Sequence, residues 1–323
     1  MKNLLGSFKG KYRICLVAVY LGRLSGWLPV WLRSCELNPQ FSFLLFCDRP
    51  EEVPFRPANL RVERTTLSEL KDRFSAVAGF QVSLINAYKL CDFKPVYGSA
   101  FADLLQSYDF WGHTDLDLYY GNLGAFLSEN ALTKYLRLYH RGHLSLFRNV
   151  PEANRLYRLP HPAVNWKTIF RSDDYMGLDE TSGIEELVRF HKIPVFEDND
   201  AIADLLPKCP DLRLARRALN RRPQVFTLEN GAAIQIFAEN GEIKRREFMY
   251  VHIQKRNLPD VDARTWRTLS NWVFTPQGFV ASPPVVWNQS TLRSFNRPSY
   301  PHLISHNWRG SLRRMKKLTC LLN

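Results

Sequence analysis

The chain has 323 residues, of which 45% are hydrophobic and 13% aromatic, and this composition excludes an intrinsically disordered protein. The formal net charge of +13 favours an anionic partner, such as a nucleotide, a nucleic acid, a phospholipid surface or an acidic glycan. The six cysteines are scattered without a CxxC pair, which argues against a structural zinc site.

The cysteines and the N-terminal region bear on where the protein resides. We interpret the cysteines as reduced core residues of a cytosolic protein, because several lie within apolar runs. The apolar run over residues 14–21 is short and is not followed by a small-residue cleavage site, so it does not indicate a signal peptide. No stretch reaches the roughly 18 apolar residues needed to span a bilayer. We therefore expect a cytoplasmic protein that is soluble or lies on a membrane surface.

The first 48 residues carry the pattern of a βαβ unit. Residues 13–20 and 41–47 are apolar without alternation, which is typical of strands buried on both faces. Between them, apolar residues recur at helical spacing from Leu28 onward. This order predicts parallel strands joined by a right-handed crossover. Ligands bind beyond the carboxyl ends of such strands, so residues 19–22 and Asp48 are predicted to lie at one rim of the sheet.

The next segment is predicted to be mostly helical. Its expected elements are one strand followed by three helices, over residues 60–65, 67–74, 82–91 and 97–106. Asp92-Phe93-Lys94-Pro95 is predicted to interrupt the helices. Lys94 lies just upstream of an acidic pair, and a solvated surface charge is the equally weighted alternative to a role beside that pair.

The stretch over residues 108–127 is the part of the chain that points most directly to chemistry. Asp115 and Asp117 follow a predicted buried strand, and in an extended segment residues i and i+2 point the same way. Two carboxylates facing one point suit a hard divalent cation that keeps positions open for phosphate oxygens. The same spacing recurs at residues 198–200 and 260–262, so spacing alone is weak. Only the first pair also precedes an apolar segment.

The region after this stretch offers further polar candidates. A strand is predicted over residues 144–147, and His143 just before it would line the cleft or serve as a hydrogen-bonded structural residue. A brief strand is expected at 194–196 and a helix at 201–206. Glu197 and Asp198 precede that helix. A solvated helix start is the default interpretation for them, and a catalytic base is the alternative.

Residues 225–254 change to antiparallel character. Asn230-Gly231 and Asn240-Gly241 separate three extended runs, and Asn-Gly is the strongest short hairpin signal. The last run is predicted to carry His252 on the strand and Lys255 at its end. An imidazole and a cation in this position suit a metal–diphosphate site, whereas an ordinary edge strand protected by basic residues is the structural alternative.

The residues from 259 onward are rich in Pro, Trp and Arg until the end of the chain. Over residues 308–323, apolar side chains fall roughly along one helical face and basic side chains crowd the rest. A basic amphipathic helix is typical of a membrane-surface anchor. A solvated helix that packs its apolar side on the domain remains an equal alternative.

Four sequence segments, together with the βαβ unit, give the chain a family resemblance. They are YKLCDFKPVYG (88–98), YDFWGHTDLDLYYGNLGAFL (108–127), RGHLSLFRN (141–149) and YVHIQKR (250–256). The chain resembles GT-A type glycosyltransferases, and in particular a bacterial glycosyltransferase-like group associated with cell-surface polysaccharide synthesis. The resemblance implies an α/β, Rossmann-like GT-A domain over residues 1–258. This domain would have a mixed central sheet flanked by helices and a C-terminal antiparallel meander, followed by an extension with a basic end over residues 259–323.

The resemblance also implies roles for individual residues. Asp115 and Asp117 match the DxD motif that holds Mn²⁺ or Mg²⁺ against the diphosphate of a UDP- or GDP-linked sugar. His252 matches a third metal ligand, and Lys255 matches a diphosphate-binding lysine. The remaining positions matched to the donor site are Val19, Tyr20, Asp48, Lys94 and Thr114.

These roles predict transfer of a sugar to a cell-surface glycan or a lipid-linked acceptor. Departure of the nucleoside diphosphate builds negative charge, which the cation on Asp115 and Asp117 and the ammonium group of Lys255 would stabilise. An inverting enzyme needs a carboxylate base, for which the candidates are Glu197, Asp198 and Asp173. A retaining enzyme needs none, and the His252 match favours retention.

Two other functions fit part of the pattern. A metal-dependent phosphohydrolase or nuclease would use the same carboxylates, but it would want further ligands for a second metal ion. A nucleic-acid-binding protein would suit the net charge. However, the densest basic runs, near the C-terminus and over residues 216–222, lie away from the predicted sheet. We therefore expect a nucleotide-sugar donor, a glycan or lipid-linked acceptor and an anionic membrane surface as partners, rather than nucleic acid.

Overall fold

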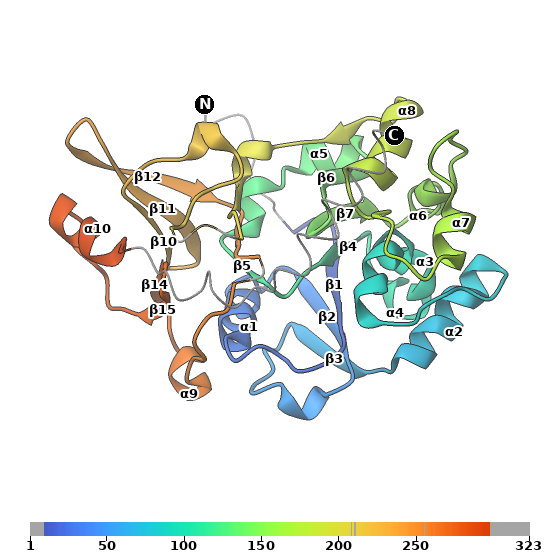
Figure 1. Ribbon diagram of the computed structural model, residues 1–323, viewed down its shortest axis with the longest axis horizontal. Coiled ribbons are helices and arrows are strands. Elements are labelled where there is room, and N and C mark those ends of the chain that lie inside the picture. Colours follow the sequence, from blue (N-terminus) through green and yellow to red (C-terminus); the bar gives the residue numbers. More distant parts are fainter. Residues whose placement is uncertain (1–9, 208, 210, 255, 298–323) are drawn as a thin grey trace, which may run out of the picture.

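The computed structural model describes residues 10–297 except 208, 210 and 255. Lys255 and the basic helix predicted over residues 308–323 lie outside the described residues, so these two predictions stay predictions. Within the described part, the chain is a mixed α/β protein with a central mixed sheet flanked by helices and a separate antiparallel sheet (Figure 1).

The central sheet has seven strands, and its core is the predicted βαβ unit. In sheet order the strands are β3 (Leu60–Arg64), β2 (Ser42–Cys47), β1 (Ile14–Tyr20), β4 (Phe110–Thr114), β7 (Leu144–Arg148), β6 (Arg137–Arg141) and β8 (Val195–Phe196). Strands β1 to β4 are parallel, and β7 runs antiparallel to β4. Four carboxyl ends therefore meet at one edge, where the candidate site lies.

The position of strand β1 inside the molecule explains why its sequence is apolar without alternation. Ile14, Leu16 and Ala18 pack into the core on one face, together with α1 (Leu28–Glu36). Cys15 and Val17 pack into the core on the other face. The strand is buried on both faces, as predicted, because helices cover both sides of the sheet. The helices on the second side include α2 (Leu67–Ala78), α3 (Tyr97–Ala100) and α4 (Ala102–Leu105) (Figure 1).

The helix predicted over residues 82–91 is wrong. Val82 and Leu84 are buried at alternate positions of a non-helical segment. The backbone N–H of Ser83, between them, donates a hydrogen bond to the carbonyl of Phe170. A 3₁₀-helical segment begins only at Ala87, after the side chain of Asn86 caps its start. It continues to Val96 through the predicted interruption. Val82 and Leu84 are thus buried at the spacing of two that an extended segment gives, not at helical spacing.

A three-stranded sheet joins distant parts of the chain beside the central sheet. It contains β5 (Leu118–Tyr120), β13 (Tyr250–His252) and β9 (Ile202–Asp204). The helix predicted over residues 201–206 is therefore wrong. The side chain of Asp198 does cap one 3₁₀ turn, but the chain then extends because β9 pairs in parallel with β13.

The second large sheet is antiparallel and has five strands. In order they are β12 (Glu242–Phe248), β11 (Ala232–Glu239), β10 (Gln224–Glu229), β14 (Asn271–Thr275) and β15 (Gly278–Ala281). Both predicted Asn-Gly hairpins form, with positive φ at each of the four turn residues. The last predicted strand is corrected: the meander ends at Phe248, and the chain crosses to the three-stranded sheet as β13. Because β14 pairs with β10, this sheet also spans the boundary predicted at residue 258.

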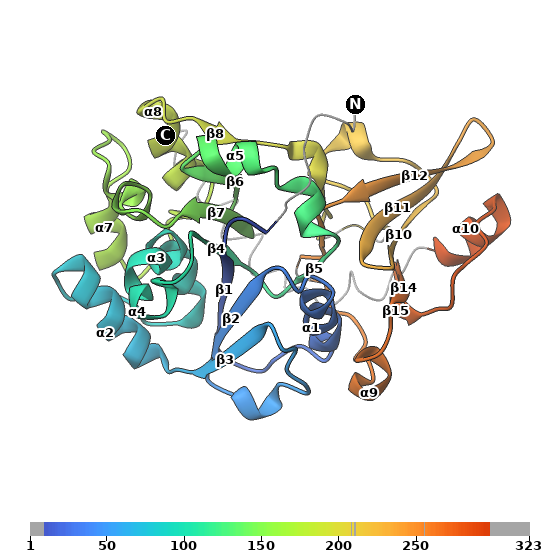
Figure 2. The same cartoon turned by 180° about the vertical axis from the view of Figure 1, so that it is seen from behind.

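The remaining helices are short and lie around the sheets. They are α5 (Glu129–Lys134), α6 (Pro151–Asn154), α7 (Trp166–Arg171), α8 (Glu186–Phe190), α9 (Ala263–Trp266) and α10 (Gln289–Phe295). The antiparallel sheet and α10 occupy one end of the molecule, and α7 and α8 the other (Figure 2). Among the described residues, none of the helices combines the length and hydropathy required to cross a membrane.

Candidate functional site

A pocket of about 480 Å³ lies at the carboxyl ends of β1 and β4. Four positions matched to the donor line it: Val19 and Tyr20 from β1, Thr114 from β4 and Lys94 from the 3₁₀-helical segment. Five of the six matched positions lie within the described residues, since Lys255 does not. The fifth, Asp48, is absent from the described lining. Its Oδ1 accepts a hydrogen bond from Gly22 N at 2.9 Å and so holds the loop that follows β1.

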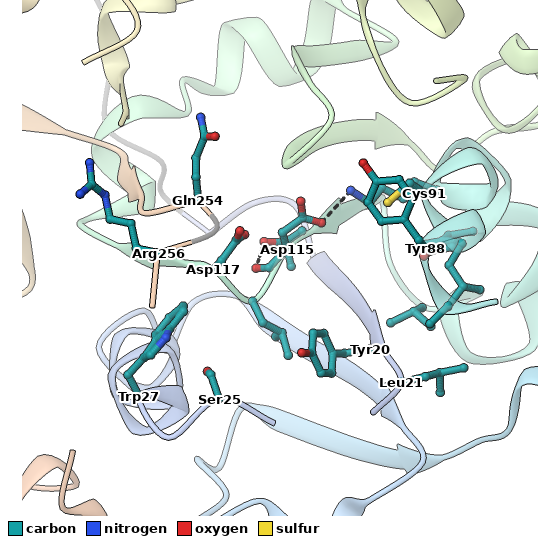
Figure 3. A pocket seen from close by; sticks show the side chains of 17 residues that line it. Tyr20, Leu21, Ser25, Trp27, Tyr88, Cys91, Asp115, Asp117, Gln254 and Arg256 are labelled. Atoms are coloured by element: carbon teal, nitrogen blue, oxygen red, sulfur yellow. Dashed lines mark hydrogen bonds and ion pairs between the residues drawn. The ribbon is translucent and has the colours of Figure 1, made fainter. Parts of the chain in front are cut away.

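Asp115 and Asp117 lie at the centre of this pocket (Figure 3). They sit in the bend between β4 and β5, rather than on one extended segment as predicted. Backbone hydrogen bonds fix the bend, from Asp115 N to the carbonyl of His143 at 3.1 Å and from Ile253 N to the carbonyl of Asp117 at 2.8 Å. His143, just before β7, and Ile253, just after β13, thus hold the backbone of the two aspartates in place.

The structure brings His252 to the same point. One ligand atom each from Asp115, Asp117 and His252 lie within 4.8 Å of one another. The imidazole Nε2 is 3.3 Å from Asp117 Oδ1, and Nδ1 is 2.8 Å from Oδ1 of Asp204. The ring also stacks on His143, with 4.0 Å between centroids. Pairing of β13 with β5 produces this convergence, because it sets His252 opposite Leu118, next to the acidic pair.

Charges around His252 favour its protonated form. Burial lowers the pKa of His252, but the neighbouring Asp117 and Asp204 outweigh burial and raise it to about 10. Burial likewise raises the pKa of Asp117, but the adjacent imidazole outweighs this and leaves the pKa below its usual value. Without a cation, His252 is therefore an imidazolium held between two carboxylates.

Lys94 is buried and is not the solvated surface charge that was its alternative. Its Nζ lies 2.7 Å from Oδ1 of Asp115 and 3.2 Å from Oδ2 of Asp179, and it donates to the carbonyl of Gly142 at 2.8 Å. Burial lowers the pKa of Lys94, but the two carboxylates raise it well above its ordinary value. Burial raises the pKa of Asp179 to about 7, even though Lys94 opposes this shift. Lys94 is thus a fixed positive charge behind Asp115.

The donor set fits a divalent cation. Two carboxylates and one imidazole suit Mn²⁺, which accepts nitrogen as well as oxygen, and are compatible with Mg²⁺. Asp117 Oδ1 is buried and, within the described part of the chain, has no hydrogen bond of regular geometry; its nearest charged partner is His252 Nε2 at 3.3 Å. A divalent cation between these two side chains would replace this contact with a bond to each of them.

The rest of the pocket lining includes aromatic and cationic side chains. Tyr20, Trp27 and Tyr88 line it, with Tyr20 and Trp27 below the acidic pair in Figure 3. Arg256 lines the side that carries Gln254. The Arg256 guanidinium donates to the carbonyls of Cys209 and Leu206 at 3.0 and 2.8 Å, which anchors it at the pocket wall.

The predicted base candidates lie away from this pocket. Glu197 joins His140 and Glu185 in a separate cluster, with His140 Nδ1 3.5 Å from Glu197 Oε1. Asp198 caps the turn before β9, and Asp173 accepts a hydrogen bond from Ser83 Oγ. None of the three is among the described lining residues.

Two carboxylates that complete the site were missed at the sequence level. Asp179 lies in a segment predicted only as loops and short helices, and no motif marks it. Asp204 was placed in a predicted helix, whereas it ends β9 directly opposite His252. The sequence offers no local signal for Asp204, because the three residues of β9 become a strand only by pairing with β13.

Comparison with known proteins adds a family but no activity. None of the curated proteins matches the chain. One family model matches residues 16–283, and its description is a family of unknown function (DUF6625). The match takes in both large sheets, except the first two residues of β1, and all of the described pocket lining. The chain therefore belongs to the family of unknown function DUF6625.

Proposed function

We propose that the protein is a metal-dependent glycosyltransferase of the GT-A type that takes its sugar from a nucleoside-diphosphate donor. The observation that carries this proposal is the meeting of Asp115, Asp117 and His252 at one point of a pocket at the carboxyl ends of parallel strands. The three residues come from two chain segments more than a hundred residues apart. In α/β sheets this edge is where nucleotides bind.

The pocket offers a separate chemistry for each part of such a donor. The flat faces of Tyr20 and Trp27 suit stacking with a nucleobase. Asp115, Asp117 and His252 would hold Mn²⁺ or Mg²⁺, which when bound supplies a Lewis acid for the diphosphate. Arg256 adds a positive charge to the pocket lining. Lys255, outside the described residues, remains a predicted partner of the diphosphate.

The lining also bears on stereochemistry. Asp115 and Asp117 are the only carboxylates among the described lining residues, and both are assigned to the cation. Glu197, Asp198 and Asp173 lie elsewhere, so the pocket itself supplies no free carboxylate to deprotonate an acceptor. This supports a retaining enzyme, because an inverting enzyme needs such a base. The acceptor would be a cell-surface glycan or a lipid-linked sugar, as the family resemblance implies.

A phosphohydrolase remains the second candidate because of one specific arrangement. His143 and Asp204 lie with His252 in another group whose ligand atoms are within 4.8 Å of one another. Two adjacent ions are the usual requirement for metal-dependent phosphoryl hydrolysis. This candidate predicts binding of two Mn²⁺ ions and release of phosphate from a nucleotide, whereas the glycosyltransferase predicts one ion and an intact nucleoside diphosphate.

Thermal unfolding with nucleotide and metal tests the proposal. We expect UDP or GDP to raise the melting temperature only when Mn²⁺ is present, since the cation joins the diphosphate to the carboxylates. A ligand at 100 times its Kd stabilises a protein by about 2.7 kcal/mol. Asp117→Asn should abolish this stabilisation. Asp200→Asn is the matched control, because Asp200 belongs to an Asp-x-Asp pair with the same spacing and is exposed.

Three outcomes would contradict the proposal. One is equal stabilisation with and without Mn²⁺. Another is full stabilisation of Asp117→Asn. The third is stabilisation by single-stranded oligonucleotides that moderate salt removes, which would favour a nucleic-acid-binding protein.

A further inference from the structure

Asp204 lies beside His252 because of strand register. Strand β9 pairs in parallel with β13, and this pairing sets Asp204 directly opposite His252. Residues opposite each other on neighbouring strands carry side chains on the same face of the sheet. The contact is thus set by backbone pairing between segments 48 residues apart.

The side chain of Asp204 makes two hydrogen bonds through one oxygen. Oδ1 is 2.8 Å from His252 Nδ1 and also accepts from Gln254 Nε2 at 2.8 Å. The opposite nitrogen of the imidazole, Nε2, faces Asp117 Oδ1 at 3.3 Å. The two nitrogens of His252 therefore have different partners on opposite sides of the ring.

The ring plane of His252 is fixed as well. His143 stacks against it, with 4.0 Å between centroids and an interplanar angle of 22°. His143 is itself held by a contact of 3.0 Å between its Nδ1 and the hydroxyl of Tyr250. With its plane and one nitrogen both fixed, the imidazole has one remaining direction for Nε2, which is towards the acidic pair.

We infer that Asp204 is a positioning residue that accepts the Nδ1 proton of His252 and so reserves the Nε2 lone pair for the cation. This inference rests on the proposed function. A histidine that binds a metal uses one ring nitrogen, and the hydrogen bond at the other nitrogen selects which one. A carboxylate in that role also makes the imidazole a stronger ligand. Asp204 is thus assigned a function through His252 and not by contact with the donor.

Two rival explanations make different predictions. If Asp204 itself ligates an ion with His143 and His252, its loss should remove one of two bound ions. If Asp204 only stabilises the edge of the small sheet, its loss should lower the melting temperature without changing metal affinity or the protonation of the His252 ring. Metal titration, melting temperature and the state of the ring together separate the three roles.

The test uses the full chain with Asp204→Asn, Asp204→Leu and the control Asp200→Asn. Mn²⁺ binding is titrated by electron paramagnetic resonance, which counts ions and gives Kd. We expect one ion for the parent and about 10- to 100-fold weaker binding for Asp204→Leu, the usual loss when such a partner is removed. Asp204→Asn keeps an oxygen acceptor without the charge, so its loss should be smaller. Asp200→Asn should bind like the parent.

Imidazole ¹H–¹⁵N correlation spectra show which ring nitrogen of His252 carries the proton. This would not change if Asp204 only stabilised the edge of the small sheet. With a diamagnetic cation, Mg²⁺, bound, His252 should carry its proton on Nδ1 in the parent and lose this preference in Asp204→Leu. Parental Mn²⁺ affinity in Asp204→Leu would overturn the inference while leaving the proposed function standing. A drop from two ions to one would overturn the inference and would favour the phosphohydrolase over the glycosyltransferase. If the parent binds no Mn²⁺, the proposed function fails and the inference fails with it.

Discussion

Lys94 shows how single residues set the electrostatics of this site. Its ammonium group lies in the interior between Asp115 and Asp179, and only 9% of its side chain is exposed. Removing one partner of a buried ion pair costs more than the pair contributes, because the remaining charge is left without compensation. The two carboxylates also differ. Asp115 reaches the pocket, whereas Asp179 is almost fully buried behind it.

We therefore predict that Lys94→Met destabilises the fold by about 3 kcal/mol at pH 8. The loss should be smaller at pH 5, because Asp179 can then take up a proton and become neutral. Urea unfolding at both pH values measures the difference. Lys134→Met is the control, since Lys134 is exposed, and it should change the free energy of unfolding by less than about 0.5 kcal/mol. Equal stability of Lys94→Met and the parent at pH 8 would contradict the assigned role of Lys94.

Asp179 gives a separate prediction for the dependence of stability on pH. Its pKa is about 7 in the folded protein, above the 3.8 of an unperturbed carboxyl group. Between these values the folded state binds more protons than the unfolded state, so the contribution of Asp179 to stability falls as pH rises from 4 to 7. Asp179→Asn removes this contribution. The melting temperature of the variant minus that of the parent should therefore increase from pH 4.5 to pH 7.5. A constant difference would show that Asp179 titrates normally.

At the scale of elements, the sequence predicts the helices, strands and hairpins whose signals lie within a few neighbouring residues. The β1–α1–β2 unit and both Asn-Gly hairpins could be predicted because burial on two faces, helical spacing and turn chemistry are each visible within a few residues. Strand β9 could not, because three residues become a strand only through pairing with β13. The acidic pair was singled out by its spacing and its place after a buried strand, and His252 by its place on a predicted strand; the family resemblance then implied their shared role. Asp204 depended on the missed strand and was therefore missed too.

Beside the site, the backbone at Gly121 lies very close to strands β11 and β12. A Cβ added there would lie 2.6 Å from the carbonyl oxygen of Phe248 and 2.7 Å from Ala233 N, both backbone atoms. We predict that Gly121→Ala costs about 1–3 kcal/mol, as expected for overpacking against atoms that cannot move aside. Denaturant unfolding measures this cost. Gly241→Ala provides a comparison, because its φ of 82° costs a smaller amount, about 1 kcal/mol, without a clash. A parental unfolding free energy for Gly121→Ala would contradict this packing.

At the scale of the whole molecule, the C-terminal region completes a sheet that begins earlier in the chain. Strand β14 lies between β10 and β15, and Trp272 and Phe274 are buried with Phe226 and Leu228 in one apolar cluster. The predicted extension thus contributes to the core in its described part. This pairing could not be foreseen, because residues 259–297 lack periodicity and the partner of β14 is more than forty residues away.

Two truncations test this arrangement. A chain ending at residue 258 should fail to fold, because it exposes one edge of β10 and the apolar cluster beneath it. A chain ending at residue 297 should keep the parental melting temperature, since the partners of all described strands are retained. Circular dichroism melting distinguishes the two. Cooperative unfolding of the shorter chain at the parental temperature would show that β14 is dispensable.

The truncation at residue 297 also tests the sequence-based prediction for the C-terminal end. If residues 308–323 form a basic amphipathic anchor, their removal should weaken binding to vesicles that contain anionic lipid, and added salt should reduce the parental binding. Sedimentation with vesicles of anionic and of neutral lipid measures both effects. Unchanged binding to the anionic vesicles would discard the anchor.

The most direct measurement is a crystal structure of the full chain grown with Mn²⁺ and UDP or GDP, with diffraction recorded at the manganese absorption edge. Our account predicts one anomalous peak bonded to Asp115, Asp117 and His252, with the diphosphate on the same ion and the base beside Tyr20 and Trp27. A peak away from these three side chains, or an ordered nucleotide in this pocket with no metal beside it, would contradict the assignment of the site.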